Sequence, residues 1–154
     1  MSNKTIVILE NIRSAHNVGA IFRTADGAGS TKIFLVGYTP TPTDRFGRAQ
    51  PEIKKTSLGA SDYVPWEYHE TIKTVRTALA GVPLIAVEQT KDAVPYTEYQ
   101  GNDAAFIFGN EVEGVSAAAI AAADRTIHVP MSGQKESLNL ATTAAICLSH
   151  YRDA

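Results

Sequence analysis

The sequence has little that would tie it to a membrane or to an oxidising compartment. Cys147 is the only cysteine, so no internal disulfide can form, and its Ala/Leu-rich surroundings predict a buried, unreactive thiol. No apolar run approaches the length needed to span a bilayer, and the first ten residues do not show the pattern of a signal peptide. We therefore expect a cytoplasmic protein with no membrane partner.

Positive charge is also scarce. The chain has 14 Lys and Arg residues against 16 Asp and Glu, a formal net charge of −2. Broad electrostatic binding of nucleic acid requires clustered Lys and Arg. The overall composition therefore argues against such binding, although a local basic patch can coexist with a mildly acidic chain.

Several common ligand-binding patterns are missing. The sequence has no G-x-G-x-x-G dinucleotide motif and no G-x-x-x-x-G-K-[ST] phosphate loop. Its four histidines are widely separated, and none has metal-ligand spacing with another His or Cys, so we predict no metal site. His128 lies within an apolar run, which predicts a core histidine with its hydrogen bonds satisfied.

The pattern that is present is that of one α/β domain. A chain of 154 residues with 44% hydrophobic residues can bury a sizeable single core, so we expect one domain over residues 1–154. Short apolar runs predict buried strands of a mostly parallel sheet at 5–9, 33–36, 84–87, 104–108 and 126–129. A further strand at 63–68 suits an edge because of Pro65. Helical segments at 18–28, 71–79 and 116–123 alternate with these runs and predict flanking helices, and 37–51 is expected to be a long loop carrying Arg45 and Arg48.

The first predicted helix has a clear core face, formed by Val18, Ile21, Phe22, Ala25 and Ala28. Arg23 falls nearly opposite that face, so it must point to solvent or to a ligand. Asn17 stands where the N-cap of the helix belongs, and capping is its simplest role.

The last predicted helix, 138–148, is apolar almost all round. Only Asn139, Thr142 and Thr143 interrupt its apolar residues, so we expect it to be buried on several sides. Packing against a second subunit is the interpretation that we favour. The alternative is a central helix in the core of a single protomer.

Three polar, glycine-containing segments follow predicted strands, at 88–90, 109–114 and 130–139. In open α/β sheets, ligands bind beyond the carboxyl ends of the strands. Each segment alone could be a simple connection: Ser137 could cap the last helix, and Glu111 and Glu113 could be paired carboxylates or solvated and capping groups. Together they predict one pocket walled by backbone amides and carbonyls, which suits an adenine and ribose better than a metal.

Three motifs resemble those of the SpoU/TrmH family within the SPOUT superfamily. Residues 11–26 (NIRSAHNVGAIFRTAD) resemble its first motif, and residues 109–114 (GNEVEG) resemble its second. The third is similar to 127–131 (IHVPM) followed by 137–141 (SLNLA). They occur in the family's order and span most of the chain.

The resemblance implies an α/β fold whose C-terminal part forms a deep trefoil knot, with S-adenosylmethionine as cofactor and no metal. It places the cofactor among ten residues: Glu88, Gln89, Phe108, Gly109, Asn110, Glu111, Val129, Pro130, Met131 and Leu138. It also places four residues at the reaction centre: Arg23, Asn17, Ser137 and Asn139.

The activity implied is RNA ribose 2′-O-methylation by a homodimer whose active sites draw on both subunits. The match covers the catalytic domain only, so RNA affinity would come from the dimer's cleft or from an accessory RNA-binding protein. We expect transfer RNA as substrate, with ribosomal RNA as the alternative. The competing hypotheses are a non-catalytic RNA-binding or assembly protein with the knotted fold, an α/β protein that binds another nucleotide, and a base-methylating SPOUT enzyme.

Overall fold

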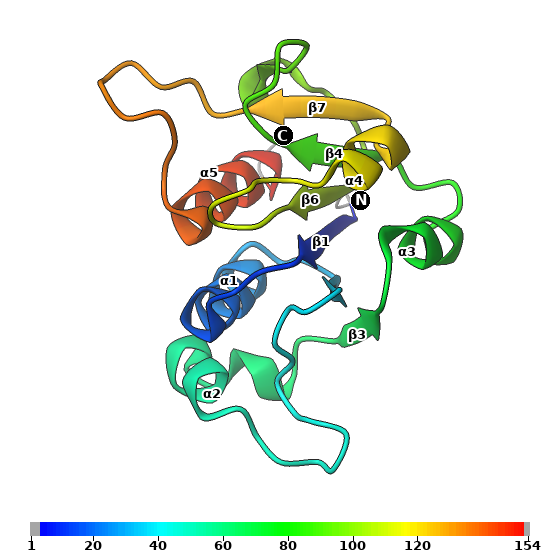
Figure 1. Cartoon of the computed structure of the whole chain (residues 1–154), viewed down its shortest axis with the longest axis vertical. Coiled ribbons are helices and arrows are strands. Elements are labelled where there is room, and N and C mark those ends of the chain that lie inside the picture. The colour runs from blue at the N-terminus through cyan, green and yellow to red at the C-terminus, as the bar shows by residue number, and fades with distance from the viewer. Residues whose placement is uncertain (1–3, 153–154) are drawn as a thin grey trace.

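Seven parallel strands form the centre of the computed structural model, which describes residues 4–152 (Figure 1). The strand order across the sheet is β3-β2-β1-β6-β4-β7-β5, and every pair of neighbouring strands is parallel. The strands are β1 (Thr5–Glu10), β2 (Lys32–Val36), β3 (Trp66–His69), β4 (Leu84–Val87), β5 (Val94–Pro95), β6 (Ala104–Phe108) and β7 (Arg125–His128). The predicted fold class, a mostly parallel sheet flanked by helices, is confirmed.

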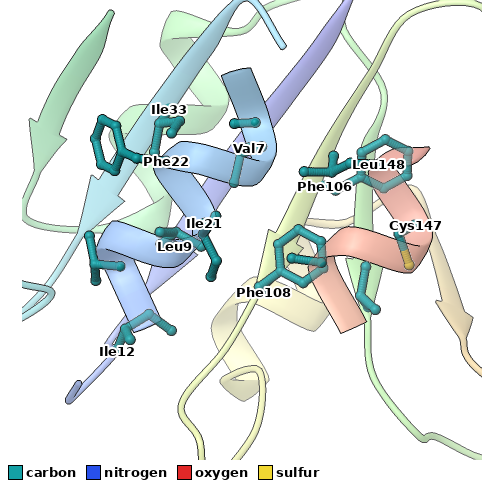
Figure 2. Packing of buried hydrophobic residues seen from close by; sticks show 14 of the residues in the cluster. Val7, Leu9, Ile12, Ile21, Phe22, Ile33, Phe106, Phe108, Cys147 and Leu148 are labelled. Carbon is teal, nitrogen blue, oxygen red and sulfur yellow. The ribbon is translucent and has the colours of Figure 1, made fainter. Parts of the chain in front are cut away.

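Helices cover both faces of this sheet, because alternate residues of each central strand point to opposite sides. Val7 and Leu9 of β1 belong to a core that also contains residues of α1 (Ala15–Gly27), α2 (Pro51–Ser57) and α5 (Leu140–Arg152). Ile6 and Ile8 point the other way, into a second core with α3 (Ile72–Ala78) and α4 (Ala117–Ala122). Burial on both faces explains why the central strands read as continuous apolar runs. Figure 2 shows α1 and α5 side by side over the first face.

The predicted strands agree closely with the observed ones. The ranges 84–87 and 104–108 are those of β4 and β6, and the other three central strands differ by no more than one residue at either end. The edge strand begins at Trp66, later than predicted, because Pro65 precedes it. Threading of the chain through its own loop stays a prediction of the family resemblance.

Four short elements were not predicted: α2, β5 and two 3₁₀-helices at Ala60–Asp62 and Tyr96–Glu98. The first, α2, begins where the expected 37–51 loop ends: Pro51 takes the first turn, and the Gln50 side chain accepts hydrogen bonds from the N–H groups of Glu52 and Ile53. The second, β5, has only two residues, too few to show a periodic pattern.

The caps of two helices also differ from expectation. Ser14 caps α1, and its hydroxyl oxygen accepts the backbone N–H of Asn17 at 3.1 Å, so the capping role predicted for Asn17 is wrong. The last helix starts at Leu140 rather than at residue 138 and continues to Arg152. Its first turn is held by Asn139, whose Oδ1 accepts the N–H of Ala141 at 2.9 Å, and not by Ser137.

Helix α5 presents two different faces. Its inner face, formed by Ala144, Cys147, Leu148 and Tyr151, is buried in the core of the protomer. Its outer face, formed by Thr142, Ala145, Ile146 and Ser149, is exposed or half-buried. The alternative of a core helix is therefore confirmed for one face, while the other remains available to a second subunit.

The single cysteine behaves as predicted. Cys147 is buried, and burial raises the pKa of its thiol to about 12, so the thiol stays protonated at neutral pH. Among residues 4–152, no helix is long and apolar enough to cross a membrane.

Candidate active site

A cavity of about 410 Å³ lies beyond the carboxyl ends of β4, β6 and β7. Its volume falls within the range of small-molecule sites. The three segments that follow these strands line it together with the residues that lead into α5. The lining residues are Val87–Thr90, Phe108–Val115, Ile120, His128, Val129, Met131, Ser137, Leu138, Leu140 and Thr143. The structure thus brings together the three segments that the sequence assigned to one pocket.

The predicted site residues divide into two groups. All the predicted cofactor-binding residues except Pro130 line the cavity, and so does Ser137. Arg23, Asn17 and Asn139 do not line it. One protomer therefore contains a nearly complete predicted cofactor site but only part of the predicted reaction centre.

The loop at 109–114 is folded tightly against itself. Asn110 and Gly114 exchange two backbone hydrogen bonds of 3.1 and 2.9 Å, and the Asn110 side-chain oxygen accepts the N–H groups of Val112 and Glu113, both at 2.8 Å. Gly114 has a φ of +76°, and a Cβ at Gly109 would collide with the backbone of the following turn. Both glycines are therefore needed to bring this backbone to the rim of the cavity.

Glu88 and Gln89 join the three walls of the cavity. One carboxylate oxygen of Glu88 accepts the N–H of Gln89 and the other accepts the N–H of Val115, both at 2.8 Å. The Gln89 side-chain amide donates to the carbonyl of Val129 at 2.9 Å. Glu88 is thus a brace between the segments after β4 and β6, in addition to being a lining residue.

Glu111 connects the cavity to the first motif. Its two carboxylate oxygens accept the backbone N–H groups of Arg13 and Ser14 at 2.9 and 2.8 Å. Partial burial raises the pKa of this carboxyl, but the backbone N–H groups of Arg13, Glu111 itself and Ser14, with a contribution from the Asn17 side chain, outweigh it and hold the pKa below its ordinary value. Of the roles considered for Glu111, the structure therefore supports the capping role, in which its carboxylate accepts backbone N–H groups.

A second link, which the sequence did not reveal, runs through Asn110. Its side-chain NH₂ donates to the carbonyl of Asn11 at 2.9 Å and to the hydroxyl of Tyr38 at 2.8 Å. Nothing local in the sequence indicates this contact, because Tyr38 and Asn110 are 72 residues apart. The start of the first motif and the start of the β2–α2 loop are therefore both tied to the cavity rim.

Arg23 points away from the core, as predicted. It is exposed on α1, and its side chain makes no hydrogen bond or ion pair with any other residue of the range 4–152. It lies six positions after Asn17, about 9 Å further along the helix axis. In this protomer its guanidinium is free to meet a ligand, but it does not face the cavity.

His128 differs from expectation. It lines the cavity as the last residue of β7, and its Nδ1 is buried without a hydrogen-bond partner among the described residues. The predicted satisfied core histidine is therefore wrong for this nitrogen. The available signal was its position at the carboxyl end of a strand, where ligands bind. Within residues 4–152, no group of three or more His, Cys, Asp or Glu side chains could hold a metal ion.

Comparison with known proteins identifies the family. Residues 4–149 match the SpoU rRNA Methylase family. The chain belongs to this family. It is 33% identical over 145 residues to the tRNA (guanosine(18)-2′-O)-methyltransferase of Thermus thermophilus, covering 92% of this chain and 71% of that protein. It is 30% identical over 156 residues to the 23S rRNA (guanosine(2553)-2′-O)-methyltransferase RlmP of Bacillus subtilis, covering 97% of this chain and 58% of that protein.

Solved structures give the same result. An AdoMet-bound rRNA methyltransferase from Sinorhizobium meliloti superposes with a TM-score of 0.88 and 29% identity, over 99% of this chain and 57% of that chain. The A. aeolicus TrmH/SpoU tRNA modifying enzyme, at 24% identity and a TM-score of 0.82, covers 99% of this chain and 75% of that chain and supports the fold alone. The chain thus spans little more than half the length of the rRNA-modifying relatives that it matches.

Proposed function

We propose that this protein transfers a methyl group from S-adenosylmethionine to a ribose 2′-hydroxyl of RNA, and that residues 1–154 act as one catalytic domain. The observation that carries the proposal is that the segments of the second and third motifs line the same cavity. The named activities of the Thermus and Bacillus relatives, both guanosine 2′-O-methylation, support the choice of ribose over base. The first relative acts on tRNA, and we propose tRNA as the substrate ahead of rRNA.

The residues of the cavity fit this cofactor. Phe108, Val129 and Leu138 offer apolar contacts for an adenine, while backbone groups of the 109–114 loop offer donors and acceptors. The buried, unpartnered Nδ1 of His128 is a polar group that a bound ligand could satisfy. When bound, S-adenosylmethionine supplies an electrophilic methyl group on a sulfonium. Glu88, whose two oxygens already brace the walls, keeps further acceptor capacity for hydroxyl groups.

The other requirement is a ribose hydroxyl held in line with that methyl group. Arg23 is suited to bind the adjacent phosphate, since a planar guanidinium matches phosphate geometry. A guanidinium keeps its proton at neutral pH, so we assign Arg23 to orienting the nucleotide and stabilising charge rather than to accepting the hydroxyl proton. Asn17, Ser137 and Asn139 would position groups by hydrogen bonds, and alignment of this kind can contribute ~7–11 kcal/mol in ideal cases.

We further propose that the active protein is a homodimer in the cytoplasm, in which Arg23 of one protomer serves the cavity of the other. The separation of Arg23 from the cavity lining within one protomer supports this arrangement. The outer face of α5 supports it too, because Ile146 and Ala145 lie there half-buried, on a helix that packs against α1. An accessory RNA-binding protein could add affinity for a chain whose net charge is −2.

The test combines binding with product mapping. Calorimetry of the purified protein with S-adenosylmethionine comes first, followed by incubation with labelled cofactor and unmodified transcripts of tRNA and rRNA. A 2′-O-methyl group blocks alkaline cleavage of the neighbouring phosphodiester, so a resistant labelled dinucleotide is the expected product. Label on a base would instead indicate a base-methylating enzyme. Absence of cofactor binding would overturn the proposal and favour the non-catalytic alternative.

A further inference from the structure

The loop between β2 and α2 contains a small folded unit, residues 43–49, which we call the 43–49 arm. Thr43 and Ala49 pair as an isolated antiparallel bridge at its base. Within it the N–H of Asp44 donates to the carbonyl of Arg48, and the N–H of Gly47 donates to the carbonyl of Asp44, both at 2.9 Å. Gly47 has a φ of +79°, which a side chain would strain. The arm is therefore a defined turn and not an irregular connection.

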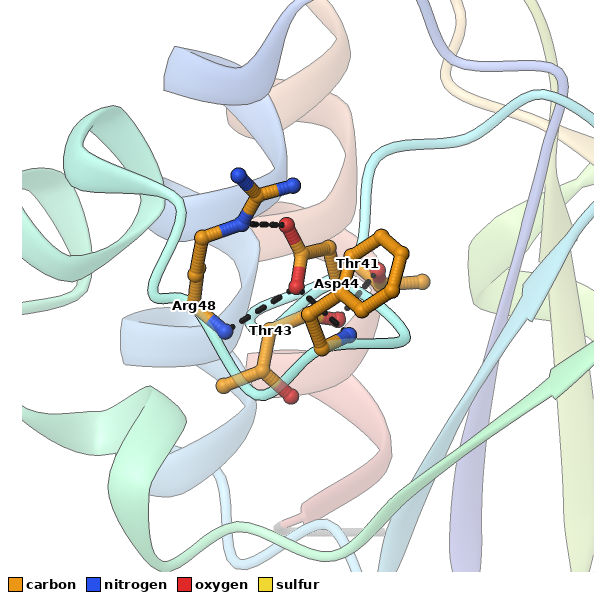
Figure 3. A network of polar contacts seen from close by, with 5 residues as sticks. Thr41, Thr43, Asp44 and Arg48 are labelled. Carbon is orange, nitrogen blue, oxygen red and sulfur yellow. Dashed lines mark hydrogen bonds and ion pairs between the residues drawn. The ribbon is translucent and has the colours of Figure 1, made fainter.

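The Asp44 carboxylate organises the arm (Figure 3). Its Oδ1 accepts the N–H groups of Phe46 and Arg48 at 2.8 and 3.0 Å, and its Oδ2 accepts the Nε of Arg48 at 2.7 Å. The Arg48 backbone N–H makes the largest contribution to lowering the pKa of this carboxyl, with smaller effects from the Arg48 side chain and from Phe46. The hydrogen bonds of the arm's only carboxylate are thus made within the arm, where they stabilise the turn.

The tip of the arm presents an exposed aromatic ring beside two cations. Phe46 is 67% exposed, and the guanidinium carbons of Arg45 and Arg48 lie 4.8 and 5.1 Å from its ring centroid. Arg45 makes no hydrogen bond or ion pair within the described part of the chain, and Arg48 uses only its Nε on Asp44. Most guanidinium N–H donors at the tip are therefore free for a ligand.

Positive charge gathers around this feature although the chain as a whole is acidic. Four of the 14 Lys and Arg residues fall between positions 45 and 55, and two of them are the exposed Lys54 and Lys55 of α2, which follows the arm. The acidic residues nearby are Glu52 and Asp44, and the Asp44 carboxylate is already bound to Arg48. In Figure 1 the arm projects at one end of the long axis, and the segment from β7 to α5 that lines the cavity lies at the other. None of residues 43–49 lines the cavity of its own protomer, so a ligand bound by both would extend over the surface between them.

We propose that the 43–49 arm binds unpaired nucleotides of the RNA substrate, with a base stacked on Phe46 and phosphates bound by Arg45 and Arg48. This inference rests on the proposed function, since it names how the same substrate is held. Aromatic side chains stack on any base, and guanidinium groups bind phosphate through paired N–H donors. One exposed ring among cations is too small an apolar surface for a stable protein contact, whereas it matches a single base and its backbone. The arm would position RNA and not read its sequence.

The test is the affinity of the purified protein for a fluorescent oligouridylate of about 15 nucleotides and for an unmodified tRNA transcript, measured by anisotropy across a salt series. We expect Phe46→Ala to weaken binding by roughly tenfold with little change in salt dependence. Arg45→Ala should weaken binding and reduce the slope of log affinity against log salt by about 0.7. Phe46→Trp, which keeps a stacking surface, should restore the affinity. Arg125→Ala, an exposed arginine of β7, is the matched control and should bind like the wild type.

The other possible outcomes either contradict RNA binding by the arm or separate it from the proposed function. Unchanged affinity and slope in both Phe46→Ala and Arg45→Ala would overturn the proposal, as would a wild-type protein that binds neither RNA. Sedimentation of the variants as dissociated subunits would instead make the arm a contact between protomers. RNA binding that depends on the arm but yields no methylated product would leave the inference standing and contradict the proposed function. If the variants bound RNA normally and the protein transferred methyl groups, the proposed function would stand and the inference about the arm would be contradicted.

Discussion

The carboxylate of Glu88 accepts the backbone N–H of Val115 at 2.8 Å, joining the end of β4 to the loop that follows β6. This contact requires a glycine at 114, because a Cβ there would run into the same carboxylate. The left-handed backbone of Gly114 adds a second reason, since its φ of +76° is one that L side chains rarely adopt. The cavity therefore depends on the absence of a side chain at one position.

Gly114→Ala should damage the cavity more than it damages the fold. We expect a loss of about 1–3 kcal/mol in the free energy of unfolding from backbone strain, and at least a roughly tenfold loss of S-adenosylmethionine affinity because Glu88 must move. Denaturant titration and calorimetry measure the two quantities. Gly27→Ala is the matched control: a Cβ at that position meets nothing within 4 Å, so cofactor affinity should not change. Equal cofactor affinity in both variants would show that the brace is not needed.

The contact between Glu111 and the first motif predicts a pH dependence. The pKa of Glu111 is held below its ordinary value of 4.5, because hydrogen bonds from the N–H groups of Arg13, Glu111 itself and Ser14, with the Asn17 side chain, outweigh the opposing effect of burial. A depressed pKa in the folded state gives a stabilisation that is present above pH 4.5 and lost as the pH falls through the folded-state value. Since the side chain is largely exposed, we expect an effect of only ~0–1 kcal/mol.

Thermal denaturation across pH 3 to 7, roughly the window in which carboxylates titrate, measures this effect. Glu111→Gln should lower the melting temperature near neutral pH and flatten its dependence on pH below 4.5. Glu113→Gln, on the same loop, provides the control and should keep the wild-type profile. If Glu111→Gln followed the wild-type curve throughout, the carboxylate would not hold the first motif.

Arg23→Ala should separate cofactor binding from catalysis. Because Arg23 is exposed and does not line the cavity, its removal should leave both folding and S-adenosylmethionine affinity unchanged. Loss of a donor that stabilises developing charge typically costs about 10²–10³ in rate, so we expect methyl transfer to fall by that factor. Arg23→Lys should recover only part of it, since an ammonium lacks the planar fork. A fully active Arg23→Ala protein would remove the role assigned to this residue.

Much of the fold could be predicted because its signals are local. Strands buried on both faces, such as β4 and β6, give short apolar runs bounded by turn residues, and their ends were predicted correctly. The edge elements were harder: β5 is two residues long, and α2 has seven residues next to a proline-rich loop. Such elements are stabilised by packing against the rest of the molecule more than by their own sequence.

The outline of the site could also be predicted from local signals. The prediction was incomplete because some of its contacts join residues that are far apart in the sequence. Parallel strands place their carboxyl ends at one edge, so the polar segments after β4, β6 and β7 had to meet. Contacts between distant residues, such as Asn110 with Tyr38, carry no local signal. The orphaned Nδ1 of His128 shows the same limit, because strand position indicates where a side chain lies but not whether its hydrogen bonds are satisfied.

The two faces of α5 predict opposite effects for substitutions that are two residues apart. Leu148 is fully buried in the core of the protomer, so Leu148→Lys should prevent folding and reports nothing about the interface. Ile146 lies on the outer face and is only half-buried, so a glutamate there can reach solvent without disturbing the core. We expect Ile146→Glu to fold, with a wild-type circular dichroism spectrum, and to sediment as a monomer. Its methyl transfer should then be lost, because in the proposed homodimer Arg23 of one protomer serves the cavity of the other. Thr77→Glu adds the same charge to an exposed site on α3, across the sheet, and should leave the dimer intact. A stable, active dimer of Ile146→Glu would place the subunit interface elsewhere.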